Sequence, residues 1–129
     1  MAVAQRIAAI EVNLTDICVQ LRNTLDPDDQ ARSPSLANVI AEIERYPSSS
    51  NFFVSPLDAS NTHELKRAFG SRVTELPQKN YRSMIDATAD IYLLARGHQL
   101  IVSEGSTFGE VAWWLGGCHQ SVVQLPAEN

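Results

Sequence analysis

The sequence predicts an α/β protein, with a Rossmann-like open parallel sheet of about five strands and helices on both faces. Short apolar segments alternate along the chain with amphipathic ones, which is the pattern of repeated βαβ units. The strand segments are apolar on both faces, as expected for strands covered by helices on both sides. The 129 residues, 44% of them hydrophobic, are enough for one core. We therefore expect residues 1–129 to form a single Rossmann-like domain.

Turn and capping residues set the boundaries of the expected elements. The predicted strands cover residues 7–14, 52–54, 72–76, 100–103 and 121–124, and the predicted helices cover residues 34–46, 61–69, 84–96 and 107–115. Ser33 and Ser83 are the expected N-caps of two of these helices, with Pro34 in the first helical position. The predicted apolar face of the third helix consists of Met84, Ala87, Ile91 and Leu94. Residues 15–33 form a long polar connection.

Composition excludes several function classes. A net charge of −5 and a pI near 5.0 argue against a nucleic-acid-binding surface, so a bound anion must be held by local donors. The two cysteines and three histidines do not have the spacing of metal ligands. We expect no metal site, no cofactor and reduced thiols. No stretch approaches the roughly 20 apolar residues of a membrane span, so a complete chain is expected to be cytoplasmic.

The turn "SEGST" at residues 103–107 follows an apolar strand and opens a helix. Such a helix N-terminus presents unpaired N–H groups to an anion, and the hydroxyls of Ser106 and Thr107 add donors. Two other readings stay open. Thr107 and Glu110 fit a capping box that needs no ligand. The stretch 105–109 also has the outline of a nucleophile elbow, with Thr107 in place of serine, as in a small hydrolase.

A second candidate cluster lies on the predicted helix 84–96. Asp86 and Asp90 are four residues apart and share one face. Asp86 lies in the first turn, where a carboxylate stabilises the helix dipole without any ligand. Asp90 lies in the middle of the helix and is a candidate to accept hydrogen bonds from a base or a ribose. Arg82, one turn earlier, could neutralise it or reach a phosphate.

Three segments, in this order and spacing, resemble the donor-binding half of the GT-B fucosyltransferases. They are "FFVSPLDASNTHELKRAFGSRV", "DATADIYLLARG" and "IVSEGSTFGEVAWWLGG". The resemblance implies binding of GDP-fucose or a similar nucleotide diphosphate sugar, with inverting transfer that needs no metal. It also implies that Asp86 or Asp90 contacts guanine or ribose, and that Ser106, Thr107 and Phe108 line the diphosphate and base pocket.

The sequence departs from the family pattern at two places. The family's first strand typically ends V-H-I-R-R-T-D, and we align residues 10–16 with it. Asn13 then replaces the first arginine, which is expected to hold the β-phosphate, and Arg6, Glu11 or Arg22 are candidates to compensate. The family's A-T-D-D after the second strand is here S-P-L-D, in which only Asp58 survives.

Three hypotheses about function follow. The first is a fucosyltransferase-like donor-binding domain, weakly active or inactive alone, because the acceptor domain of a GT-B enzyme does not fit in 129 residues; a separate chain or domain would then bind the acceptor. The second is a non-enzymatic interaction module that uses Trp113 or Trp114, one of which is expected in the core. The third is the hydrolase that uses Thr107.

Overall fold

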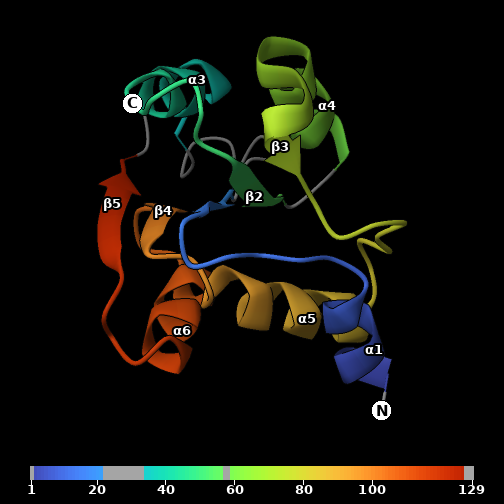
Figure 1. The fold of residues 1–129 in the computed structure, drawn as a ribbon. Helices are drawn as coiled ribbons and strands as arrows, with labels where there is room; N and C mark the ends of the chain where they lie inside the picture. Colours follow the sequence, from blue (N-terminus) through green and yellow to red (C-terminus); the bar gives the residue numbers. More distant parts are fainter. Residues whose placement is uncertain (1, 22–33, 57–58, 127–129) are drawn as a thin grey trace.

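The computed structural model describes residues 2–21, 34–56 and 59–126 and shows a five-stranded sheet in the order β3-β2-β1-β4-β5 (Figure 1). All four strand pairings are parallel, so the predicted fold class is confirmed. The strands are β1 (Ile17–Gln20), β2 (Phe52–Ser55), β3 (Val73–Thr74), β4 (Gln99–Ser103) and β5 (Ser121–Leu125). The helices are α1 (Ala2–Ala8), α3 (Leu36–Glu44), α4 (Ala59–Phe69), η1 (Gly70–Arg72), α5 (Met84–Leu94) and α6 (Thr107–Leu115).

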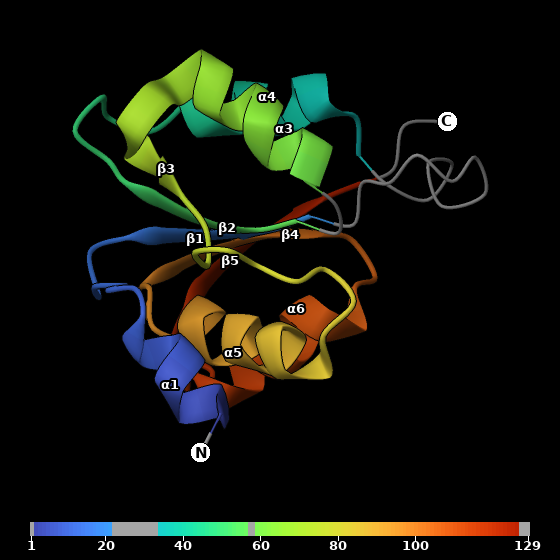
Figure 2. The ribbon, with the colours of Figure 1, turned by 90° about the vertical axis from the view of Figure 1, so that its right-hand side faces the viewer.

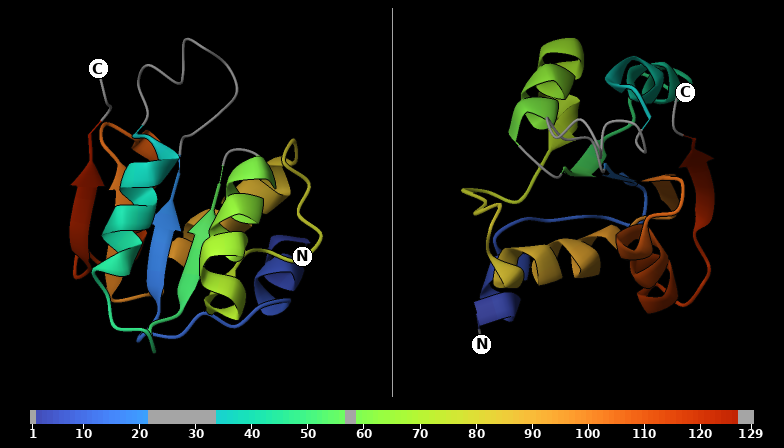
Figure 3. Two further views of the ribbon diagram at one scale, coloured as in Figure 1. Left: turned by 90° about the horizontal axis from the view of Figure 1, so that it is seen from above. Right: turned by 180° about the vertical axis from the view of Figure 1, so that it is seen from behind.

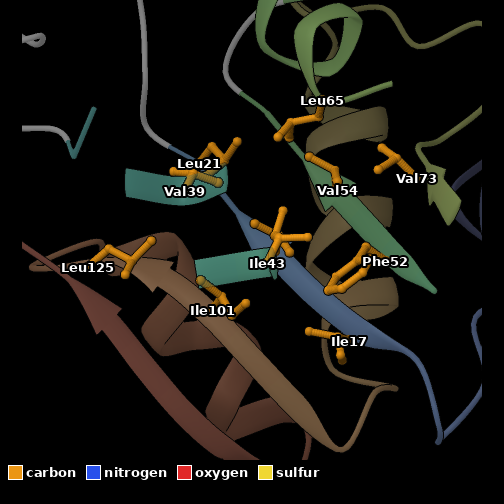
Figure 4. Close-up of a cluster of buried hydrophobic side chains, with 11 residues drawn as sticks. Ile17, Leu21, Val39, Ile43, Phe52, Val54, Leu65, Val73, Ile101 and Leu125 are labelled. Atoms are coloured by element: carbon orange, nitrogen blue, oxygen red, sulfur yellow. The ribbon is translucent and has the colours of Figure 1, made fainter. Parts of the chain in front are cut away.

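Helices cover both faces of the sheet. Figure 2 shows α3 and α4 on one side and α1, α5 and α6 on the other. Neighbouring strand residues point to opposite faces, so Val19 joins the core under α3 and α4 while Cys18 joins the core under α5 and α6. Figure 4 shows the first of these cores, in which Val39 and Ile43 of α3 meet apolar strand residues. All the buried side chains of this core are at most 9% exposed.

The first strand differs from the prediction. Residues 7–14 form the end of α1 and an irregular segment, and β1 lies further on, at Ile17–Gln20. The apolar spacing of Val3, Ile7 and Ile10 is that of a helix, and Ile7 and Ile10 pack against the core under α5 and α6. The strand prediction was wrong because a short apolar run does not by itself distinguish the two elements.

Serine caps begin the helices α3, α5 and α6, and two of these caps lie one or two residues from the expected position. Ser83 caps α5 as predicted, and its side chain accepts a hydrogen bond from the Asp86 amide. The cap of α3 is Ser35 and not Ser33, which lies outside the described residues. The cap of α6 is Ser106, whose Oγ accepts from Gly109 N. Thr107 is therefore the first helical residue, and the predicted Thr107–Glu110 capping box is wrong.

The buried face of α5 matches the predicted one only in part, since Leu94 is buried and Ile91 packs against the core as expected. Met84, the first residue of the predicted apolar face, is 80% exposed, whereas Asp86 and Asp90 are 5% and 1% exposed. The helix therefore turns both carboxylates towards the protein interior. Each must have hydrogen-bond partners there, since an unpaired buried charge is strongly destabilising.

The parallel arrangement brings the carboxyl ends of all strands to one edge of the sheet, as the arrows of β1, β2 and β5 show in the left view of Figure 3. The chain runs from β1 outward to β3 on one side and continues through β4 to β5 on the other. The strand order thus reverses between β1 and β4. Open α/β sheets bind ligands in the crevice outside this point.

Candidate functional site

A hollow of about 610 Å³ lies at this edge, where β1, β2, α5 and α6 meet. Its polar lining includes Gln20, Ser55, Lys79, Asp90, Ser106 and Thr107. Its apolar lining includes Leu21, Pro56, Ala87, Ile91, Phe108 and Val111. A cavity of this volume with an apolar wall and a few polar groups has the usual dimensions of a small-molecule site.

The N-terminus of α6 contributes open backbone donors to the hollow. The amides of Gly109 and Glu110 are bonded to Ser106 Oγ and Ser106 O. In the described part of the chain, the amides of Thr107 and Phe108 have no hydrogen-bond partner. Both residues line the hollow. The site therefore offers two backbone N–H groups at the positive end of a helix dipole, which favours an anion.

Two glycines shape this region, one in the turn before α6 and one where α6 packs on the sheet. Gly105 has a φ of 77°, a left-handed conformation that other residues adopt at a cost. At Gly109, a Cβ atom would lie 2.6 Å from Val102 Cγ1 and 3.0 Å from Val102 Cβ. A larger residue there would push the first turn of α6 away from β4.

Asp90 forms the charged part of the wall. Its Oδ2 accepts a hydrogen bond from Ser55 Oγ at 2.7 Å and forms an ion pair with Lys79 Nζ at 2.5 Å. Burial raises the pKa of the Asp90 carboxyl above its ordinary value, although Lys79 and Ser55 act in the opposite direction. Its Oδ1 has no partner among the described residues. The carboxylate is thus held by one oxygen and unsatisfied at the other.

Gln20 provides a second unsatisfied group in the same wall. It is the last residue of β1 and is 6% exposed, and its Oε1 has no partner in the described part of the chain. Buried polar groups are nearly always hydrogen-bonded. Two unsatisfied buried oxygens, on Gln20 and Asp90, in the lining of one hollow therefore point to a polar ligand.

The structure separates the two aspartates that the sequence grouped together. Asp86 does not line the hollow; its Oδ1 accepts from Arg6 Nε at 2.8 Å and its Oδ2 from Asn80 N at 2.7 Å. Burial favours its neutral form, but the hydrogen bonds from Arg6 and Asn80 outweigh this and lower the pKa of Asp86. Asp86 fastens α1 and the loop before α5 to the molecule.

The remaining candidates from the sequence have different places. Arg82 is exposed, between two lining residues, and its side chain does not line the hollow. Asp58 and Arg22 lie outside the described residues. Thr107 has no left-handed backbone, and no histidine occurs among the described lining residues, so nothing here favours a nucleophile elbow. Trp113 is partly buried and packs against the core, whereas Trp114 is 58% exposed, so adjacent tryptophans point in different directions as expected.

Sequence reasoning missed three lining residues. Gln20 lies in β1, which the sequence did not reveal as a strand. Ser55 and Lys79 matter because Asp90 is buried beside them, and sequence spacing does not show that contact. Lys79 stands in a polar loop after the third predicted strand, and a lysine in such a loop is normally exposed. Among residues 2–21, 34–56 and 59–126, no group of acidic, histidine or cysteine residues could hold a metal ion, and no helix is long and apolar enough to cross a membrane.

Comparison with known proteins identifies the fold. No protein-family model matches the sequence, and no curated protein matches it significantly. Among solved structures, the fucosyltransferase NodZ from Bradyrhizobium superposes with a TM-score of 0.66 at 24% sequence identity. The chain has the fold of one part of a fucosyltransferase. The match covers 88% of this chain and 41% of the other, so the chain spans less than half the length of its structural neighbour.

Two further structures of NodZ α-1,6-fucosyltransferase agree with this result. One was co-crystallised with GDP and superposes with a TM-score of 0.64, and one was soaked with GDP-fucose and superposes with a TM-score of 0.62. Each is 22% identical to this chain and matches over 88% of this chain and 41% of its own. The predicted likeness to part of a fucosyltransferase is confirmed at the level of the fold.

Proposed function

We propose that this chain binds a nucleoside diphosphate sugar of the GDP-fucose type and is the donor-binding half of a fucosyltransferase-like glycosyltransferase. The observation that carries the proposal is the hollow at the strand reversal, with the open amides of Thr107 and Phe108 at its edge. The structural neighbours co-crystallised with GDP and soaked with GDP-fucose support it.

The diphosphate is assigned to the N-terminus of α6. The protein carries a net charge of −5, so a doubly charged group needs local donors. Two unpaired amides and the hydroxyls of Ser106 and Thr107 supply them, at the start of a helix that Gly109 lets approach β4. Fixed backbone donors also stabilise charge that develops on a leaving diphosphate.

The nucleoside is assigned to the apolar part of the hollow. Ala87 and Ile91 of α5 and Phe108 and Val111 of α6 line it, and such walls suit the faces of a planar base. Asp90, on the same face of α5, has an oxygen without a partner, which can accept a hydrogen bond from a base N–H. Asp90, rather than Asp86, is therefore the proposed base contact.

The position of β1 changes the expected phosphate-binding cation. Residues 10–16 precede the strand and lie at the opposite edge of the sheet from the hollow, so Asn13 does not occupy the family's arginine position. If the end of the observed strand is aligned with V-H-I-R-R-T-D, Val19 matches the valine, Gln20 the histidine and Arg22 the first arginine. Arg22 is our proposed partner of the β-phosphate; it lies outside the described residues.

Acceptor binding is assigned to another domain or chain. The chain matches only 41% of the length of its structural neighbours, and GT-B enzymes carry out transfer in a cleft between two domains. We therefore expect donor binding, but little or no transfer, from residues 1–129 alone.

Isothermal titration calorimetry tests the proposal. GDP and GDP-fucose should bind to one site, and Asp90→Asn and Arg22→Ala should each weaken GDP binding by about tenfold or more, since hydrogen bonds to charged groups contribute about 1.5–3 kcal/mol. Arg67→Ala, on the exposed side of α4, is the matched control and should bind normally. A folded protein that shows no binding at millimolar GDP would overturn the proposal.

A further inference from the structure

Lys79 is the basic side chain among the described residues that line the hollow, and it is almost fully buried. Its side chain is 7% exposed. Nζ lies 2.5 Å from Asp90 Oδ2 and 3.1 Å from Pro56 O, and 4.9 Å from the centre of the Tyr81 ring. Each of these groups attracts a cation. The ammonium is therefore held against the wall rather than free to follow a ligand.

The loop that carries Lys79 is itself fixed. Gln78 has a φ of 50°, a left-handed conformation that non-glycine residues adopt only where the surroundings impose it. Two residues after Lys79, Tyr81 donates its hydroxyl to Glu75 Oε2 at 2.7 Å, and Thr62 Oγ1 donates to the same oxygen at 3.2 Å. The loop after the lysine is thus tied to Glu75, which directly follows β3, and through it to α4.

The consequence is an Asp90 carboxylate with only one unpartnered oxygen, which is buried in the wall of the hollow. Oδ2 is occupied twice, by Lys79 and by Ser55. Oδ1 has no partner among the described residues. A carboxylate that is free at both oxygens can accept two parallel N–H groups from a base, whereas this one can take a single N–H on Oδ1.

We propose that Lys79 is a positioning residue for base recognition, which holds Asp90 so that its single free oxygen accepts one ring N–H of a 6-oxopurine. This inference rests on the proposed function and deepens it. The site then recognises the N1–H that guanine and hypoxanthine share, and the 2-amino group of guanine contributes little. IDP binds about as tightly as GDP.

Lys79 also sets the pH range of binding. The titratable groups around Asp90 are Lys79 and Tyr81 from the loop and Glu75 after β3, and Ser55 of β2 adds a hydroxyl. Glu75 and burial both favour the neutral carboxyl, and Lys79 opposes them. Without Lys79, the carboxyl binds its proton more tightly and loses the acceptor at higher pH. GDP binding by Lys79→Met is therefore weakest in mildly acidic buffer and recovers as the pH rises.

Calorimetry with GDP, IDP and inorganic pyrophosphate tests this role. For the wild type, we expect GDP and IDP to bind within about threefold of each other. Lys79→Met should lose about tenfold or more in GDP affinity in acidic buffer, since a hydrogen bond to a charged group contributes about 1.5–3 kcal/mol. The loss should become smaller as the pH is raised, and pyrophosphate binding should not change. Lys79→Arg should restore most of the affinity, and Lys66→Met, on exposed α4, is the control.

Each other result overturns the inference in a distinguishable way. If the wild type binds GDP tenfold or more tightly than IDP, both carboxylate oxygens of Asp90 accept from the base. The wild-type protein alone provides this test. Equal losses of GDP and pyrophosphate at every pH show that Lys79 contacts phosphate. Unchanged GDP binding by a folded Lys79→Met variant shows that Lys79 has no role in base recognition. If the wild type binds no nucleotide, the proposed function and this inference both fail.

Discussion

Thr107→Pro removes one backbone donor from the proposed diphosphate site while leaving the helix able to form. Thr107 is the first residue of α6, and proline is well tolerated at this position because its missing N–H has no helical partner. The preceding Ser106 has φ −75° and ψ 115°, an extended conformation that a residue before proline prefers. We therefore expect stability to change by less than about 1 kcal/mol.

The expected effect on binding is much larger. The Thr107 amide has no partner in the described part of the chain, so the substitution removes a donor that only the ligand uses. A hydrogen bond to a charged group contributes about 1.5–3 kcal/mol, which corresponds to a loss of roughly tenfold to a hundredfold in GDP affinity. Titration calorimetry measures this loss, and thermal unfolding confirms that the variant is folded.

Thr107→Ala is the matched control, because it removes the exposed hydroxyl and keeps the N–H group. It should lose only a few-fold in affinity. A folded Thr107→Pro that binds GDP as tightly as the wild type would refute the assignment of the diphosphate to α6. Equal losses in both variants would assign the effect to the hydroxyl instead of the amide.

Two further predictions concern stability. Arg6→Met leaves the buried Asp86 carboxylate without its ion-pair partner and should lower the free energy of unfolding by about 2 kcal/mol in urea titrations near neutral pH. The pKa of Asp86 is lowered in the fold, so the stability that this carboxylate contributes is present above its ordinary pKa and is lost as the pH falls through its lowered pKa. The difference in unfolding free energy between wild type and variant should therefore shrink below about pH 4. An undiminished difference would contradict the ion-pair role. Gly109→Ala places a Cβ 2.6 Å from Val102 Cγ1 and should cost about 1–3 kcal/mol; adding Val102→Ala should cost less than the sum of the two single effects, and strict additivity would show that the two side chains do not clash.

Secondary structure in the later part of the chain was predicted correctly because hydrophobic pattern, turn residues and capping residues indicate the same elements there. The helix of residues 107–115 and the strand of residues 100–103 were predicted almost to the residue, and Ser83 was recognised as a cap. In this region, apolar runs end at turn residues and serines precede the helices. The turn at residues 103–107 was proposed as an anion site because it opens a helix directly after an apolar strand.

The structure of the first 20 residues and the buried polar contacts could not be predicted from the sequence. The strand Ile17–Gln20 is only four residues long, ends in glutamine, and is buried on both faces, so it shows no alternating pattern. The burial of Asp90 depends on Ser55 and Lys79, 35 and 11 residues away in the sequence. Such contacts are set by tertiary packing and not by local propensity.

The central claim is that GDP lies in the hollow with its diphosphate at the N-terminus of α6. The most direct measurement is amide NMR of the labelled chain during titration with GDP and with pyrophosphate. Both ligands should shift the amides of Thr107 and Phe108, and GDP should additionally shift those of Ala87 and Ile91. Shifts confined to other parts of the molecule, or no shifts at millimolar GDP, would contradict the account.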